Sequence, residues 1–147
     1  FLGPAGVLDE FSLVKGDART LHRVQPAVSV GAGGRQDWRL TAGPAHAGRL
    51  YVVAGSYGTS PGLPLGNVTV PLVPDSWMSM SLGLANSSVY PGSIGLLDGN
   101  GAAAAAFVLP PAWSPALVGQ VVHHAFVVLH GSSFVHASNA VKLVFNP

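Results

Sequence analysis

The sequence predicts an all-β fold, a single Ig-like or Greek-key β-sandwich of roughly seven to nine strands. Short apolar runs recur, and turn residues close them about every 8 to 15 residues. The 19 glycines and 12 prolines separate strand-like segments rather than forming a disordered tract. No amphipathic segment of helical period extends over about ten residues. The 147 residues suffice for one domain with its own core.

The first 26 residues are rich in charge and contain two strand-like pieces, "FSLV" and "LHRV". We expect residues 27–147 to form the sandwich, and residues 1–26 to form either an extra hairpin of it or an extended arm. An arm would add a strand to a neighbouring copy by β-augmentation. The candidate donor-strand residues are Phe11, Leu13, Leu21 and Val24.

Three segments in the first half of the sandwich have strand patterns. "PAVSVGAGGRQDWRLTAG" predicts a strand, a glycine-rich turn and a strand, because Trp38, Leu40 and Ala42 alternate with polar residues. Trp38 is therefore expected in the core. "RLYVVAG" is a continuous apolar run of strand length, and "NVTVPL" places three apolar residues on one face.

The segment "WMSMSLGL" also has a period of two. Its methionines and leucines alternate with Ser79 and Ser81, whereas a helix would scatter the two serines. The pattern predicts a strand. Trp77 falls on the serine face and is expected to be exposed.

The C-terminal stretch "VGQVVHHAFVVLHGSSFVHASNAVKLVF" predicts a long strand, a tight turn at "HGSS" and one or two further strands. Near the end of the chain, Val141, Leu143 and Phe145 alternate with Lys142 and Val144. This alternation predicts a half-buried last strand.

Five consecutive alanines lie between "DGNG" and "LPP". A helix of about eight residues is marginal alone, the residue before a proline avoids the helical region, and "DGNG" has hairpin-turn chemistry. Residues 102–109 are therefore predicted to form a strand, in which something must pack close to the small side chains. One face of this strand is a candidate assembly strip for a neighbouring copy or the N-terminal arm, formed by Ala102, Ala104 and Ala106.

Charge is scarce and segregated. Only 9% of residues are charged, against about 25% in a typical domain, and residues 1–49 hold ten of the thirteen charges. A net charge of +1 offers nucleic acid no attractive field, and no apolar run is long enough for a transmembrane helix. A surface poor in charge is either a neutral extracellular surface or one covered by neighbouring copies, because obligate interfaces are poor in charge. Under the second alternative, copies of the chain itself are the expected partners.

No residue set predicts catalysis, a metal site or a cofactor. The chain has no cysteine, and no G-x-S-x-G motif occurs. His123 and His124 are adjacent in a strand and point to opposite faces, while His136 is expected near His130 across the turn. The protein is predicted not to be an enzyme.

Exposed aromatic residues favour a second kind of partner, glycans. Trp77 and Trp113 are the candidate ligand aromatics. Two glycosylation sequons begin at Asn67 and Asn86, and the sequence alone does not decide whether either is used.

From about residue 26, the chain resembles a Gly/Pro-rich β-sandwich module found at the C-terminus of many secreted proteins of planctomycete-type bacteria. The resembling blocks are "LTAGPAHAGRLYVVAGSYGTSPGLPL", "VPLVPDSW", "SIGLLDGNGAAAAAFVLP", "PALVGQVVHHAFVVL" and "ASNAVKLVF". The resemblance implies a secreted module without catalytic residues of its own. Because the sequence begins with Phe1 rather than Met, we expect either a mature N-terminus left by removal of a signal peptide or the boundary of a fragment.

These observations predict a non-catalytic extracellular or cell-surface structural protein that self-associates, as a filament or surface-layer subunit whose N-terminal arm adds a strand to a neighbour. The alternative is a carbohydrate- or cell-surface-binding module formerly appended to a secreted enzyme.

Overall fold

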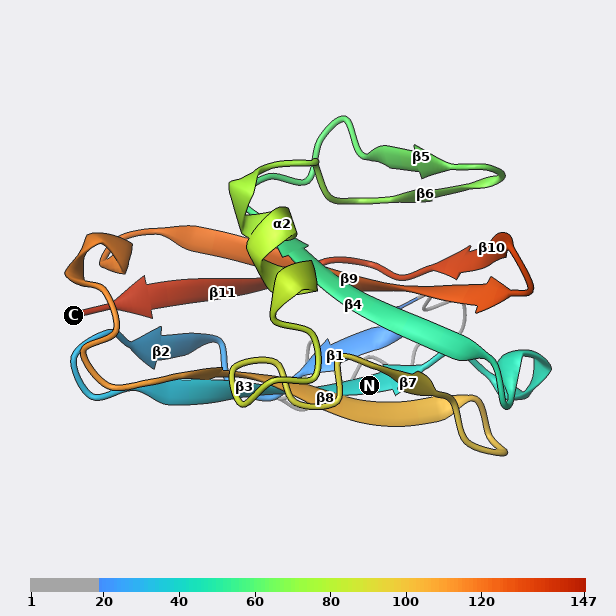
Figure 1. Cartoon of the computed structure of the whole chain (residues 1–147), viewed down its shortest axis with the longest axis horizontal. Helices are drawn as coiled ribbons and strands as arrows, with labels where there is room; N and C mark the ends of the chain where they lie inside the picture. The colour runs from blue at the N-terminus through green and yellow to red at the C-terminus, as the bar shows by residue number, and fades with distance from the viewer. Residues whose placement is uncertain (1–18) are drawn as a thin grey trace, which may run out of the picture.

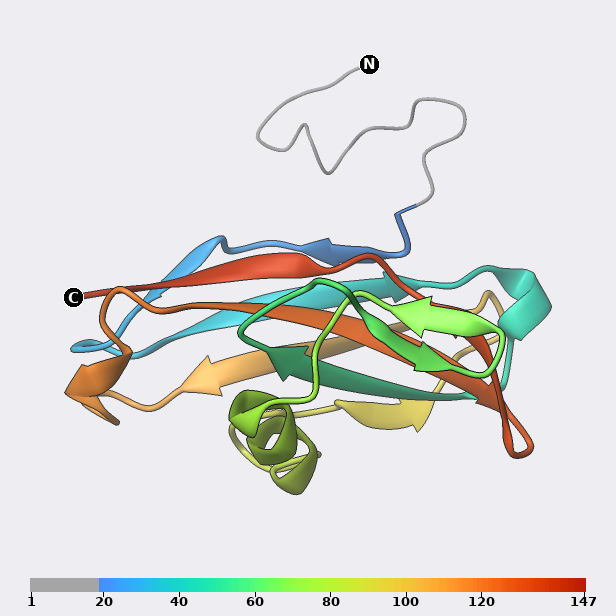
Figure 2. The same cartoon turned by 90° about the horizontal axis from the view of Figure 1, so that it is seen from above.

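The computed structural model describes residues 19–147, which form a β-sandwich (Figures 1 and 2). The predicted all-β class is confirmed. Strands outnumber the expected seven to nine because five of them have only three residues. The elements in chain order are β1 (Leu21–Arg23), β2 (Ala27–Ser29), β3 (Gly34–Thr41), η1 (Pro44–His46), β4 (Leu50–Ser56), β5 (Leu63–Leu65), β6 (Val68–Val70), α2 (Ser76–Gly83), β7 (Ile94–Leu96), β8 (Ala102–Leu109), η2 (Pro115–Leu117), β9 (Val121–His130), β10 (Ser133–Ala137) and β11 (Val141–Asn146).

Two sheets face each other. The smaller sheet has the order β1-β3-β8, and the larger has the order β2-β11-β9-β4-β7, with β10 also pairing with β9. All pairs are antiparallel except β2 with β11. The separate hairpin β5–β6 lies over the outer side of the larger sheet (Figure 1). Figure 2 shows α2 and β1 at opposite sides of the sandwich.

The main core fills the space between the sheets. Its largest fully buried apolar side chains come from both layers and include Leu40, Tyr90, Phe107, Phe126 and Leu143. Trp38 is also buried there, as its alternating pattern predicts. A second apolar cluster lies under the β5–β6 hairpin and α2, and consists of Val70, Leu72, Met78, Ala125 and Val127. Residues of β9 therefore pack on both faces, which explains its nearly continuous apolar sequence.

The segment predicted as a strand from "WMSMSLGL" is the helix α2, so that prediction was wrong. Its start is fixed by Asp75, whose carboxylate accepts a hydrogen bond from the Met78 amide at 3.0 Å. Trp77 and Ser81, four residues apart, are both buried on one helical face. Ser81 is buried with its hydrogen bonds made, because its hydroxyl donates to the Met78 carbonyl and accepts from the Gly55 amide. Ser79 is exposed whereas Ser81 is buried, so the helix does place the two serines on different faces. The capping Asp75 is the sequence signal for this helix.

The alanine run is confirmed as strand β8. It pairs with β3, and its other edge is held by the chain's own residues 89–91. Val108 donates its amide to the Val89 carbonyl at 2.8 Å, and Ala106 donates to the Pro91 carbonyl at 3.2 Å. Small side chains allow this approach, because a Cβ on neighbouring Gly92 would already lie 3.0 Å from the Ala104 carbonyl oxygen.

Candidate functional site

Three aromatic side chains that are distant in sequence meet in one cleft. It lies between α2, the residue that follows β4, and the segment that leads into η2, and its volume is about 330 Å³. The lining residues are Tyr57, Ser76, Trp77, Met80, Trp113, Ser114 and Leu117. The structure thus brings together Trp77 and Trp113, the two candidate ligand aromatics. Tyr57, which the sequence patterns did not single out, joins them.

One carboxylate holds two walls of the cleft in place. Asp75 accepts a hydrogen bond from the Tyr57 amide at 2.8 Å with one oxygen and caps α2 with the other. Tyr57 and Trp77 consequently lie edge to face, with ring centroids 5.6 Å apart and an interplanar angle of 66°. The relative orientation of Tyr57 and Trp77 is therefore fixed by hydrogen bonds between Asp75 and the backbone.

Trp77 forms the floor of the cleft rather than an exposed platform. Its side chain is only 4% exposed, which corrects the prediction from its place on the serine face. The indole N–H donates to the Tyr90 hydroxyl at 3.0 Å, and that hydroxyl is 2.8 Å from His124 Nε2. Phe107 and Phe145 contact the same indole. Trp77 is thus anchored in the core while its outer part lines the cleft.

The buried end of this hydrogen-bonded chain is uncharged at neutral pH. Burial lowers the pKa of His124 to about 3, and the charge of neighbouring His123 lowers it further in the same direction. Burial raises the pKa of Tyr90 far above its ordinary value, against the opposing effect of the hydrogen bond from Trp77. The support under the cleft is therefore a neutral polar network in an apolar core.

The aromatic side chains at the rim of the cleft are accessible, since Trp113 and Tyr57 are each 40% exposed. Trp113 follows Ala112, which has a φ of 53° and donates its amide to the Val30 carbonyl. Ser76 and Ser114 contribute hydroxyl groups, and none of the described residues lining the cleft is charged. The cleft offers aromatic surface and neutral hydrogen-bonding groups.

The candidate assembly strip lies on the outer face of the smaller sheet. Ala104 is exposed, whereas Ala106 is buried. The register places Ala102 beside Thr41, Ala104 beside Arg39 and Ala106 beside Asp37. The strip is therefore bordered by polar and charged side chains of β3, and the adjoining strand edge bonds to residues 89–91.

The N-terminal donor-strand residues divide into two groups. Phe11 and Leu13 lie outside the described residues. Leu21 is buried in β1, which pairs with β3 of its own sheet, and Val24 just after β1 is 69% exposed. The segment from residue 21 onward is thus a strand of this sandwich.

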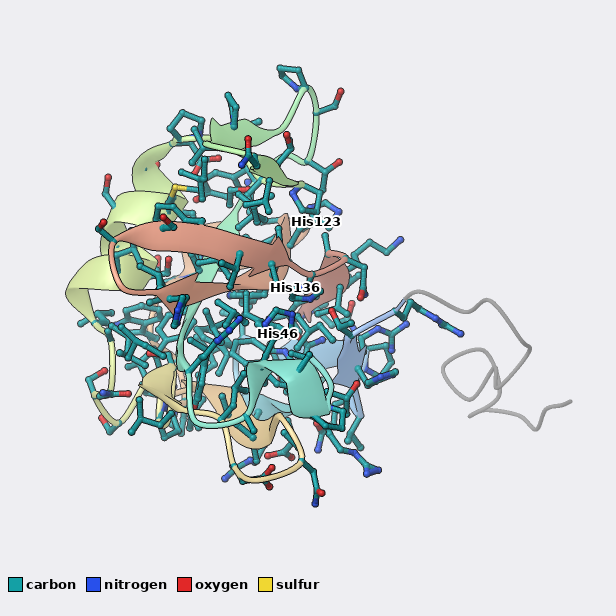
Figure 3. All side chains as sticks on the ribbon, turned by 90° about the vertical axis from the view of Figure 1, so that its right-hand side faces the viewer. His46, His123 and His136 are labelled. Atoms are coloured by element: carbon teal, nitrogen blue, oxygen red, sulfur yellow. The ribbon has the colours of Figure 1, made fainter. Side chains whose placement is uncertain are left out.

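The histidines do not assemble a metal site, since the part of the chain that the structure describes has no group of three metal-ligating side chains. His136 lies beside His46, with ring centroids 5.4 Å apart (Figure 3). It is not the strand partner of His130, because it pairs with Val128 and His130 pairs with Ser133. Burial lowers the pKa of both, helped by the charge of Arg49 at His46 and that of His46 at His136. Among the described residues, no helix is long and apolar enough to cross a membrane.

Comparisons with known proteins find solved structures that are similar to the chain, but no matching sequence. No family model and no curated protein matches the chain. Among solved structures, the chain is similar to the Pseudomonas aeruginosa CupB2 chaperone, with 16% identity, a TM-score of 0.45 and coverage of 85% of this chain and 54% of the chaperone. It is also similar to the E. coli chaperone DraB, with 13% identity, a TM-score of 0.44 and coverage of 88% of this chain and 56% of the chaperone. A third similar structure is the ASH / PapD-like domain of human CEP192, with 8% identity, a TM-score of 0.31 and coverage of 99% of this chain and 96% of that domain. The chain thus spans about half the length of the two chaperones.

Proposed function

We propose that the protein is a non-catalytic, extracellular or cell-surface binding module for neutral carbohydrate. The convergence of Tyr57, Trp77 and Trp113 on one uncharged cleft carries this proposal. Its volume of about 330 Å³ lies at the lower end of small-ligand sites, and suits one or two sugar rings.

The chemistry of the cleft matches a sugar ring. A pyranose has an apolar face of C–H groups and a rim of hydroxyls. Aromatic rings provide large, rigid apolar surface for the face, and the Ser76 and Ser114 hydroxyls provide donors and acceptors for the rim. An ionic ligand would find no charged partner among the described lining residues.

The cleft is also preorganised. Asp75 fixes Tyr57 and the start of α2, and Tyr90 fixes the Trp77 indole. A ligand that enters then orders few side chains beyond Trp113, so little of its binding free energy is spent on conformational entropy.

The test is calorimetric titration with a panel of neutral oligosaccharides of glucose, galactose, mannose and xylose. We expect at least one series to bind, and Trp113→Ala to weaken that binding at least about tenfold because a stacked ring is lost. Val118→Ala, which shortens another exposed apolar residue of the same region, is the matched control and should bind normally. Absence of binding to every sugar, or equal binding by Trp113→Ala, would contradict the proposal.

Self-association into a filament or surface layer is the second candidate, and the β7 edge favours it. β7 is the last strand of its sheet, and its Leu96 is 67% exposed beside the 39% exposed Leu50 of β4. The Asn86 side chain accepts a hydrogen bond from the Ile94 amide at this edge, so the template for pairing with another chain is the part of β7 around Leu96. Sedimentation over a wide concentration range tests this, with Leu96→Lys expected to reduce assembly. A strictly monomeric wild-type protein would exclude it.

A further inference from the structure

A second groove lies on the other side of the sandwich from the aromatic cleft. It runs between β1 and the start of β11, has a volume of about 180 Å³, and is lined by Arg19, His22, Arg23, Asn139 and Lys142 among others. In Figure 2, β1 and α2 occupy opposite sides of the molecule, so the groove and the cleft are separate sites.

Side-chain amides hold the walls of this groove together. Asn139 bonds to the amides of Thr20 and Leu21 and to the Leu21 carbonyl. The buried Gln36 donates to the carbonyls of Gln25 and Lys142, at 2.7 and 3.1 Å. The backbone segments that carry the cationic side chains are thus fixed relative to one another.

The groove concentrates positive charge in a chain that has little charge. Three of the seven lysines and arginines line it, and no carboxylate of the described residues does. Among these residues, neither Arg23 nor Lys142 pairs with a carboxylate, while Asp37 pairs with Arg35. Two cations that share one concave site attract an anion more strongly than isolated surface cations do.

We propose that this groove binds the anionic groups of an acidic polysaccharide, one that carries carboxylates or sulfates along a sugar chain. The Arg23 guanidinium matches the geometry of both anions, and the ammonium group of Lys142 adds a second charge. The volume accommodates one anionic group at a time, so affinity comes from a polymer that presents many.

The closed edge of β1 favours a polysaccharide over an acidic peptide. Asn139 occupies the outward amide and carbonyl of Leu21, so a peptide cannot add as a strand there. A sugar polymer recognised through its acidic groups needs no such backbone pairing. The short groove and the net charge of +1 do not provide the extended basic stripe that duplex nucleic acid requires.

The experiment is calorimetric titration with dextran sulfate and polygalacturonate, with neutral dextran and polyglutamate as comparisons, at about 50 and 200 mM salt. We expect both acidic polysaccharides to bind, with an affinity that falls about tenfold over this salt range. Neutral dextran should not bind the Trp113→Ala variant, in which the aromatic cleft is impaired. The two polymers distinguish sulfate from carboxylate as the preferred group, and binding by either supports the site.

The variant Arg23→Gln/Lys142→Gln should lose at least about tenfold in affinity, since two charged contacts are removed. Arg35→Gln/Arg49→Gln removes the same net charge outside the groove and should change affinity less than about twofold. Circular dichroism and thermal unfolding confirm that both variants fold. Equal losses in the two variants, binding of neutral dextran by Trp113→Ala, or equally tight binding of polyglutamate would overturn the proposal. Trp113→Ala should bind the acidic polysaccharides normally, so the two proposals, for the groove and for the aromatic cleft, can fail independently.

Discussion

The side-chain amide of Asn139 closes the outer edge of β1 by bonding both backbone groups of Leu21, each at 3.0 Å. Asn139 lies in the turn before β11, so this contact joins the two sheets across residues that are 118 apart in sequence. The contact makes β1 part of the sandwich and leaves no free backbone groups at Leu21 for a neighbouring strand.

Asn139→Ala should therefore destabilise the fold by about 2–3 kcal/mol, because the backbone groups of Leu21 and Thr20 lose partners in a partly buried place. Urea unfolding measures the free energy, and hydrogen exchange should show faster exchange at the Leu21 amide. Asn100→Ala, in an exposed turn, is the control and should have little effect. Equal stability of both variants would show that water replaces the amide.

Substitution of the two tryptophans of the cleft should have very different effects on the free energy of unfolding. Trp77→Ala should cost about 3–5 kcal/mol, since it empties a buried site and leaves the Tyr90 hydroxyl without its donor. Trp113→Ala should cost less than about 1 kcal/mol because the side chain is half exposed. Thermal unfolding compares them. A large loss of stability in Trp113→Ala would mean that this residue is structural.

Strands could be predicted from the sequence where turn-forming residues mark both of their ends. Ala102–Leu109 was predictable because "DGNG" and a proline limit it more strongly than the helical propensity of alanine favours a helix. The α2 helix was missed because a period of two in eight residues masked a capping aspartate.

The sites were only partly predictable. Trp77 and Trp113 could be chosen as large aromatics near prolines, but Tyr57 joins them only through the Asp75 hydrogen bond. Likewise, Arg23 and Lys142 meet because β1 and β11 lie side by side, a tertiary relationship with no local sequence signal. The sequence shows which residue types are present, whereas the order of the strands decides which of those residues come together in a site.

Stability should fall on acidification because of His124. Its pKa is lowered to about 3 in the folded protein, below the ordinary value of 6.5, so the unfolded chain binds the proton more readily. The contribution is complete above about pH 6.5 and is lost as pH falls from there toward about 3, by roughly 1.4 kcal/mol per pH unit. Urea unfolding at several pH values measures this slope.

The matched variant for this effect is His124→Phe, which keeps an aromatic ring beside Trp38 and Phe107 but cannot titrate. It should have a shallower dependence on pH, although its stability at neutral pH should be lower because Tyr90 loses a hydrogen-bond partner. His46, His123 and His136 have pKa values lowered in the same direction, so some slope should remain. An unchanged slope in His124→Phe would assign the acid sensitivity to those residues.

The turn before the alanine strand provides a prediction with a control two residues away. Gly101 has a φ of 74°, and a Cβ there would collide with the Gly43 carbonyl, so Gly101→Ala should destabilise by at least about 2 kcal/mol. Gly99 lies in open space without a positive φ, and Gly99→Ala should be neutral or slightly stabilising because it restricts the unfolded chain. The backbone must pass close to Gly43 because Ala42 donates its amide to the Gly101 carbonyl at 2.9 Å. Thermal unfolding of the two variants decides the matter: equal melting temperatures would mean that the Gly43 loop moves aside without cost.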